Sequence, residues 1–124
     1  MDRSMPLYMI QVAYTPEAKA ALAQVPEDRS IVFGGLVQDM GGQLDAFYNT
    51  LGDYDALAIF EAPDEEAAHA IELAASKPGH LKETKLTPLV PVKKSVRAMQ
   101  EASKQEYPAP KGFAARHHVE LWGG

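Results

Sequence analysis

Apolar and polar residues follow one another in runs that predict strands and helices in a regular order. The apolar run over residues 7–14 is rich in β-branched and aromatic residues and has the length of one strand. Thr15-Pro16 then predicts a helix start, because threonine caps helices and proline fits the first helical position. Pro26 interrupts this helix. The helical pattern resumes over residues 27–40, and Gly41-Gly42 predicts its end.

The second half of the pattern begins with two strands, predicted over residues 43–51 and 54–61. Gly52-Asp53 between them predicts a two-residue hairpin turn, since glycine reaches a positive φ without a Cβ clash. A helix capped by Asp64 follows, and a polar strand is expected over residues 80–89.

The order of elements is β-α-β-β-α-β, with an extra helix and a tail after it. With right-handed crossovers this order predicts an α+β, ferredoxin-like sandwich. We expect the sandwich over residues 1–90, an amphipathic helix over 91–105 and an extended tail over 106–124.

The hairpin register predicts two apolar faces on the sheet. Pairing across Gly52-Asp53 sets Asn49 opposite Ala56, Phe47 opposite Ala58 and Asp45 opposite Phe60 on one face. The other face holds Tyr48, Leu57 and Ile59, and we expect the helices there. A sheet that is apolar on both faces needs a second cover. The sequence therefore predicts that the Phe47 face meets a second copy, as a homodimeric α/β barrel or a larger assembly.

Candidate ligand-binding residues are expected on that partner-facing side. Gln11, Asn49 and Tyr54 can converge there with Met9, Phe47 and Phe60, as a mostly apolar pocket with a few polar groups. Ordinary hydrogen bonding at an interface explains the same residues. Gly52 and Asp53 are interpreted as turn residues and Asp55 as a structural carboxylate, because no His-Asp spacing supplies the partner of a general acid or base.

The formal charge of −5 is unevenly distributed. Residues 1–90 hold 6 basic and 14 acidic side chains, a charge of −8, whereas residues 91–124 hold 6 basic and 3 acidic, a charge of +3. An acidic body argues against nucleic acid as a partner, since phosphates need a basic stripe. The charge difference predicts that the tail docks on an acidic surface of a neighbouring subunit through Phe113, Leu121 and Trp122.

Other features limit the chemistry and the compartment. The chain has no cysteine, which excludes disulfides and thiolate catalysis and suits a reducing compartment. The start lacks the features of a signal peptide, and no run approaches a membrane span. We therefore expect a soluble cytoplasmic protein without a membrane partner.

No motif predicts a metal or a cofactor. The sequence has no phosphate loop, nucleophile motif or zinc-ligand spacing. His69 lies beside the apolar stripe of its predicted helix, where a solvated histidine is expected. His117 and His118 are adjacent, and neighbouring side chains do not readily share a metal.

Several short segments at matching spacings resemble the GYD domain family, over roughly residues 7–103. They are Tyr14-Thr15, Pro26-Glu27-Asp28-Arg29, Gly41-Gly42, Leu51-Gly52-Asp53-Tyr54-Asp55, Glu61-Ala62-Pro63-Asp64, Leu86-Thr87-Pro88-Leu89 and Val96-Arg97-Ala98-Met99. The family is similar in fold to dimeric α/β barrel proteins, which include cofactor-free oxygenases, haem-degrading enzymes and small-molecule sensors. This likeness adds His80, at a strand start where a cavity opens in some related barrels. Gly34-Gly35 and the tail after Tyr107 depart from the family pattern.

Two classes of function stay open, because the resemblance implies no agreed reaction and no catalytic residue. One is a homo-oligomeric small-molecule-binding or assembly module without turnover. The other is a cofactor-independent oxygenase or isomerase-like enzyme acting on a small aromatic or quinone-like substrate. A polar-lined cavity with His80 or Tyr54 in its wall favours the enzyme, and a filled interface favours assembly.

Overall fold

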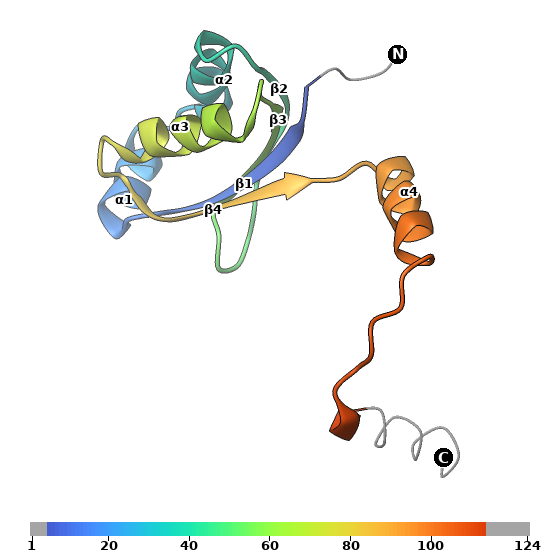
Figure 1. Ribbon diagram of the computed structural model, residues 1–124. Helices are drawn as coiled ribbons and strands as arrows, with labels where there is room; N and C mark the ends of the chain where they lie inside the picture. Colours follow the sequence, from blue (N-terminus) through green and yellow to red (C-terminus); the bar gives the residue numbers. More distant parts are fainter. Residues whose placement is uncertain (1–4, 114–124) are drawn as a thin grey trace. The chain divides into compact units, whose positions relative to one another are not determined.

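The computed structural model describes residues 5–113 (Figure 1). The chain divides into two units, residues 1–89 and 90–124. The elements of the first unit are β1 (Leu7–Tyr14), α1 (Pro16–Gln24), α2 (Arg29–Asp39), β2 (Gln43–Asn49), β3 (Ala56–Glu61), α3 (Glu65–Ser76) and β4 (Leu81–Leu89). The second unit holds α4 (Val92–Ala102).

The four strands form one antiparallel sheet in the order β2-β3-β1-β4. The expected α+β class is confirmed, and the strand order is consistent with a ferredoxin-like sandwich. Figure 1 shows α2 and α3 on the same face of this sheet. We call this the helix face and the opposite side, which carries Met9, Gln11, Tyr48, Leu57 and Ile59, the open face.

Each helix of the first unit begins at a side chain that satisfies a free backbone N–H of the first turn. The capping acceptors are Thr15, Asp28 and Asp64. Because Asp28 is the cap, α2 begins at Arg29, slightly later than the apolar pattern alone predicts. These caps place Tyr14 and Arg29 at the same end of the helix layer, since each lies beside a helix start.

The core lies between the helix face and the two helices α2 and α3. Phe60, Ile10, Ile71 and Val37 are its largest fully buried side chains. The Phe33 ring meets Phe60 edge-on at 5.7 Å between centroids. An aromatic pair in this geometry stabilises the fold by more than its buried area alone, so the two rings fix this part of the core.

The expected assignment of the two faces is wrong. Ala56, Ala58 and Phe60 are 1%, 2% and 0% exposed because they lie beneath the helices, and Phe47 packs against the same cluster. The alternation of side chains along the strands identifies two apolar faces of the sheet. Which of the two the helices cover depends on how well the helices pack against each face.

The expected two-residue hairpin is also wrong. β2 ends at Asn49 and β3 begins at Ala56, so residues 50–55 form the connection. Thr50 holds this loop closed, since its N–H donates to the Asp55 carbonyl at 2.9 Å and its hydroxyl to the Tyr54 carbonyl at 2.7 Å. Gly52 has the expected positive φ, at 133°.

The predicted pairs Asn49–Ala56 and Phe47–Ala58 are confirmed, but the pairing of Asp45 with Phe60 is not. The register shifts between Leu44 and Ala46, and Leu44 lies opposite Phe60. A β-bulge inserts one extra residue on one strand, so it reverses the facing of every residue beyond it. Leu44 thereby joins the core beside Phe60.

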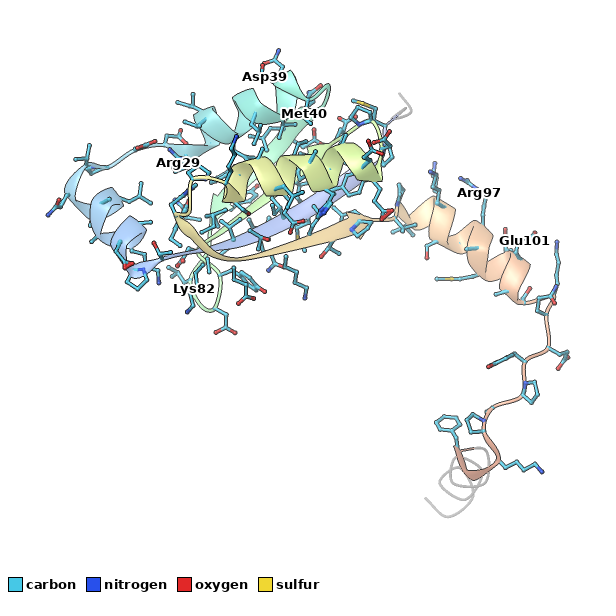
Figure 2. All side chains as sticks on the ribbon, turned by 60° about the vertical axis from the view of Figure 1, so that its left-hand side comes forward. Arg29, Asp39, Met40, Lys82, Arg97 and Glu101 are labelled. Atoms are coloured by element: carbon cyan, nitrogen blue, oxygen red, sulfur yellow. The ribbon has the colours of Figure 1, made fainter. Side chains whose placement is uncertain are left out.

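In the second unit, α4 carries apolar residues on one stripe and basic residues beside it. Val92, Val96 and Met99 are 77%, 42% and 63% exposed. Figure 2 labels Arg97 and Glu101 on this helix. Phe113 is 60% exposed, while Leu121, Trp122, His117 and His118 lie outside the described residues. Within residues 5–113, no helix has the length and apolar character needed to cross a membrane.

Candidate functional site

A cavity of about 260 Å³ lies between the helix face and the helices α2 and α3. Its wall is mostly apolar and comes from β1, β2, β3, α2, the C-terminal part of α3 and the start of β4. The lining residues are Ile10, Val12, Tyr14, Arg29, Val32, Phe33, Leu36, Phe47, Ala56, Leu57, Ala58, Ala74, Ala75, Pro78, His80 and Leu81.

Small side chains explain why this part of the core is hollow. Ala56 and Ala58 on the sheet share the cavity wall with Ala74 and Ala75 on α3. These four alanines leave space that larger side chains would fill. Ligand pockets in proteins have volumes of about 300–1,000 Å³, so this cavity lies just below that range and suits a small ligand.

Three polar side chains gather in this otherwise apolar wall. The Tyr14 and His80 rings stack with centroids 6.2 Å apart and planes at 24°. Arg29, the first residue of α2, is the third, and Figure 2 labels it where that helix begins. The Tyr14 side chain is 8% exposed, and its hydroxyl has no hydrogen-bond partner among residues 5–113.

Burial and nearby charges keep Tyr14 and His80 neutral. Burial raises the pKa of the Tyr14 hydroxyl; Arg29 lowers it, and Asp55 and Glu27 raise it further. Burial is also the main cause of the lowered pKa of His80, and the positive charge of Arg29 lowers this pKa further. The site at neutral pH therefore contains a phenol, a neutral imidazole and a guanidinium cation.

A polar hollow of about 880 Å³ adjoins the cavity and shares Tyr14, Arg29 and Phe47 with it. Its carboxylates already have partners. Asp28 caps α2, Glu27 pairs with Arg29, and Asp55 accepts the Tyr14 backbone N–H at 2.8 Å. In the described part of the chain, no group of three or more His, Asp or Glu side chains is arranged to hold a metal ion. The carboxylates that line the hollow are thus engaged in ion pairs, hydrogen bonds and a helix cap within the chain.

The structure brings together some of the predicted ligand residues. Phe47 and His80 line the cavity, and Asn49 joins Phe47 at the polar hollow. Gln11 lies on the open face, opposite Leu57 of β3. The five candidates therefore do not share one pocket.

Tyr54 stands apart in the β2–β3 loop. Its hydroxyl donates to the Glu83 carboxylate at 2.7 Å, and this hydrogen bond is the main cause of the raised pKa of Tyr54. Gly52 and Asp53 are exposed in the same loop. The Asp55 carboxylate bonds to the Tyr14 N–H and lies 3.5 Å from the Lys19 ammonium, which ties the loop to the end of β1.

Sequence reasoning missed Tyr14 and Arg29 as cavity residues. Both belong to segments that carry the family resemblance, Tyr14-Thr15 and Pro26-Glu27-Asp28-Arg29. Both also adjoin a capping residue at a helix start. Two helices that begin beside the same end of the sheet bring the residues next to their caps together. The two capping motifs are therefore the sequence signal that could have identified Tyr14 and Arg29.

Comparisons with known proteins agree with the fold. A family model described as GYD domain matches residues 8–99. A crystal structure of MtbAldR is similar with a TM-score of 0.53 at 16% identity, over 73% of this chain and 59% of that one. TTHA0845 from Thermus thermophilus matches at 13% identity over 85% of this chain and 100% of its own, with a TM-score of 0.46. The likeness to MtbAldR supports the fold alone. No curated protein matches.

Proposed function

The chain belongs to the GYD domain family, and on that premise we propose that it is a small-molecule-binding protein that works as a homodimer. The ligand occupies the cavity between the helix face and helices α2 and α3. The observation that carries the proposal is an apolar, ligand-sized space with polar groups only in one part of its wall. Such a wall gives affinity through apolar burial and orientation through a few hydrogen bonds.

The dimer part of the proposal rests on the open face. Met9, Ile59 and Leu57 are only half-buried there, and Tyr48 is 63% exposed. In residues 5–89 the packed helices lie on the other side of the sheet. Because a contiguous apolar surface is normally covered, a second copy of the same face supplies that cover.

A cavity-filling variant tests where the ligand binds. Ala74→Phe places a ring in the cavity wall, whereas Leu73→Phe, at a neighbouring 57% exposed site on α3, leaves the cavity unchanged. The uncharged fluorescent probe N-phenylnaphthylamine should bind the native protein and Leu73→Phe, and lose at least about tenfold in affinity for Ala74→Phe. Equal binding to all three proteins would place the ligand elsewhere.

Sedimentation tests the homodimer. Ile59→Glu puts a charge at the centre of the open face, and we expect it to convert the dimer into monomers. Leu73→Glu is the matched control, since it makes the same kind of change on the helix layer. A native protein that sediments as a stable, folded monomer at micromolar concentration would overturn the dimer.

One observation favours a second candidate, a cofactor-independent oxygenase or isomerase-like enzyme for an aromatic or quinone-like substrate. His80 lies in the cavity wall as a neutral imidazole, which can accept a proton from a bound molecule. In this case His80→Gln should abolish turnover and leave binding of the substrate nearly unchanged. If binding is retained in the native protein without any conversion of the bound compound, the non-catalytic function stands.

A further inference from the structure

The cavity wall has one formal charge at neutral pH. Of the described residues that line it, Arg29 alone is ionised, because His80 is neutral and no aspartate or glutamate is among them. A cation beside apolar surface is stabilised by an anion that it can reach. The cavity therefore favours a negatively charged group, which its apolar residues alone would not do.

Glu27 satisfies part of the Arg29 side chain. Its carboxylate contacts one terminal nitrogen, Nη1, and Glu27 lines the polar hollow but not the cavity. A guanidinium has five N–H donors in a planar fork, so one carboxylate leaves donors unused. Arg29 lines both spaces and can thus hold Glu27 on one side and a ligand on the other.

Two neutral donors lie with Arg29 in the same wall. The Tyr14 hydroxyl is one, and it has no partner within residues 5–113. The neutral His80 ring is the other, with one N–H to donate. A guanidinium, a phenol and an imidazole N–H together match a group that accepts several hydrogen bonds and carries one negative charge.

We propose that the ligand is an apolar molecule with a single carboxylate, held by Arg29, Tyr14 and His80, with its apolar body between the alanines of β3 and α3. This inference rests on the proposed ligand-binding function. Arg29 pairs well with a planar carboxylate, because both groups offer two parallel hydrogen-bonding positions. A doubly charged phosphate fits less well, since the wall supplies only one cation.

Pairs of acids and their neutral amides test the charge preference. Benzoate, cinnamate and octanoate are each compared with benzamide, cinnamamide and octanamide, which have nearly the same shape. Isothermal titration should show that at least one acid binds about tenfold or more tightly than its amide, as expected when a charge-assisted pair replaces a neutral one.

Variants then assign the preference to the cavity. Arg29→Gln should make acid and amide bind equally, whereas Lys19→Gln, a cation of the hollow that does not line the cavity, should keep the preference. Tyr14→Phe retains the ring and removes the hydroxyl, so it should weaken acid binding a few-fold. It also serves as a second test if Arg29→Gln lowers the content of folded protein, which circular dichroism measures.

The outcomes separate this inference from the function on which it rests. Equal binding of acids and amides by the native protein, or an acid preference that survives Arg29→Gln, overturns the carboxylate and leaves a ligand cavity. Binding of N-phenylnaphthylamine without any binding of the acids also overturns the carboxylate alone. Failure of the acids, the amides and N-phenylnaphthylamine together overturns the proposed function itself.

Discussion

Phe60 and Ile59 are neighbours on β3, and both are large and apolar, yet they lie in different surroundings. Phe60 is on the helix face, 0% exposed and in contact with the ring of Phe33, while Ile59 is on the open face and half-buried. The helix face is covered by helices of the same chain, and for the open face we propose a second copy as the cover. Apolar character alone therefore does not tell which face of a strand the helices cover.

A second contrast lies within the helix face. One end is filled by aromatic rings, with Tyr8 and Phe60 at 5.9 Å between centroids. The other end is lined by alanines and is hollow. Phe33 joins the two parts, since its ring contacts Phe60 and also lines the cavity, so the filled and the hollow parts of this layer are in direct contact.

The largest expected effect comes from replacing the two neighbours on β3. Phe60→Ala should lower the free energy of unfolding by about 3–5 kcal/mol, because it leaves a cavity in a filled part of the core. Ile59→Ala should lower the stability of the isolated protomer much less, since the side chain is only half-buried. Urea unfolding at low protein concentration measures both.

The concentration dependence sharpens this comparison. If the open face forms the dimer, the effect of Ile59→Ala should grow with protein concentration while that of Phe60→Ala should not. If Ile59→Ala and Phe60→Ala lost equal stability at every protein concentration, both faces of the sheet would be covered within one chain.

Two glycines provide the next comparison. A Cβ at Gly42 would lie 2.0 Å from the Glu61 carbonyl oxygen, whereas a Cβ at Gly35 would meet no atom within 4 Å. Gly42→Ala should destabilise by about 1–3 kcal/mol, because the end of α2 must move away from β3. Gly35→Ala should stabilise by about 0.5–1 kcal/mol, since alanine is the better helix former. Thermal unfolding of the two variants distinguishes these signs, and a loss of stability in Gly35→Ala would reveal a covered surface there.

Much of the fold could be predicted from the sequence. Prolines, caps and glycines locate the helix ends, as Thr15, Asp28 and Asp64 illustrate. The bulge near Asp45 and the closed loop over residues 50–55 could not be predicted, because they depend on hydrogen bonds between strands and within the loop. The choice of the helix face also depends on packing, which alternation along a strand does not describe.

The candidate site was only partly predictable for the same reason. Alternation predicts Phe47 in a pocket on the partner-facing side, and the family resemblance suggests His80 beside a cavity, whereas both line the cavity beneath α2 and α3. Tyr14 and Arg29 were missed, because their proximity follows from where two helices begin relative to the sheet. The hollow itself depends on four alanines, whose spacing in the sequence is ordinary for a strand and a helix.

The tie between the β2–β3 loop and the cavity end of β1 should have a moderate effect. Asp55→Ala removes the acceptor of the Tyr14 backbone N–H, and we expect a loss of about 1–2 kcal/mol in the free energy of unfolding. Asp53→Ala, at an exposed position in the same loop, should change stability by less than about 0.5 kcal/mol. Chemical denaturation checks the pair, and equal effects would show that the contact of Asp55 with Tyr14 contributes nothing.

The smallest expected effect is the pH dependence that His80 adds at the hollow end of the helix face. Burial, and then the charge of Arg29, lowers the pKa of His80 in the folded state. The unfolded chain, with an ordinary histidine pKa of about 6.5, therefore binds a proton more readily than the folded one as the pH falls. The stabilisation from keeping His80 neutral is present above about pH 6.5 and is lost as the pH falls below it toward the folded pKa. Urea unfolding at pH values on either side of about 6.5 should thus show a loss at the acid side that His80→Gln reduces. If His80→Gln and the native protein lost the same stability on acidification, the imidazole would be as well solvated as in the unfolded chain and could not lie in an apolar cavity wall.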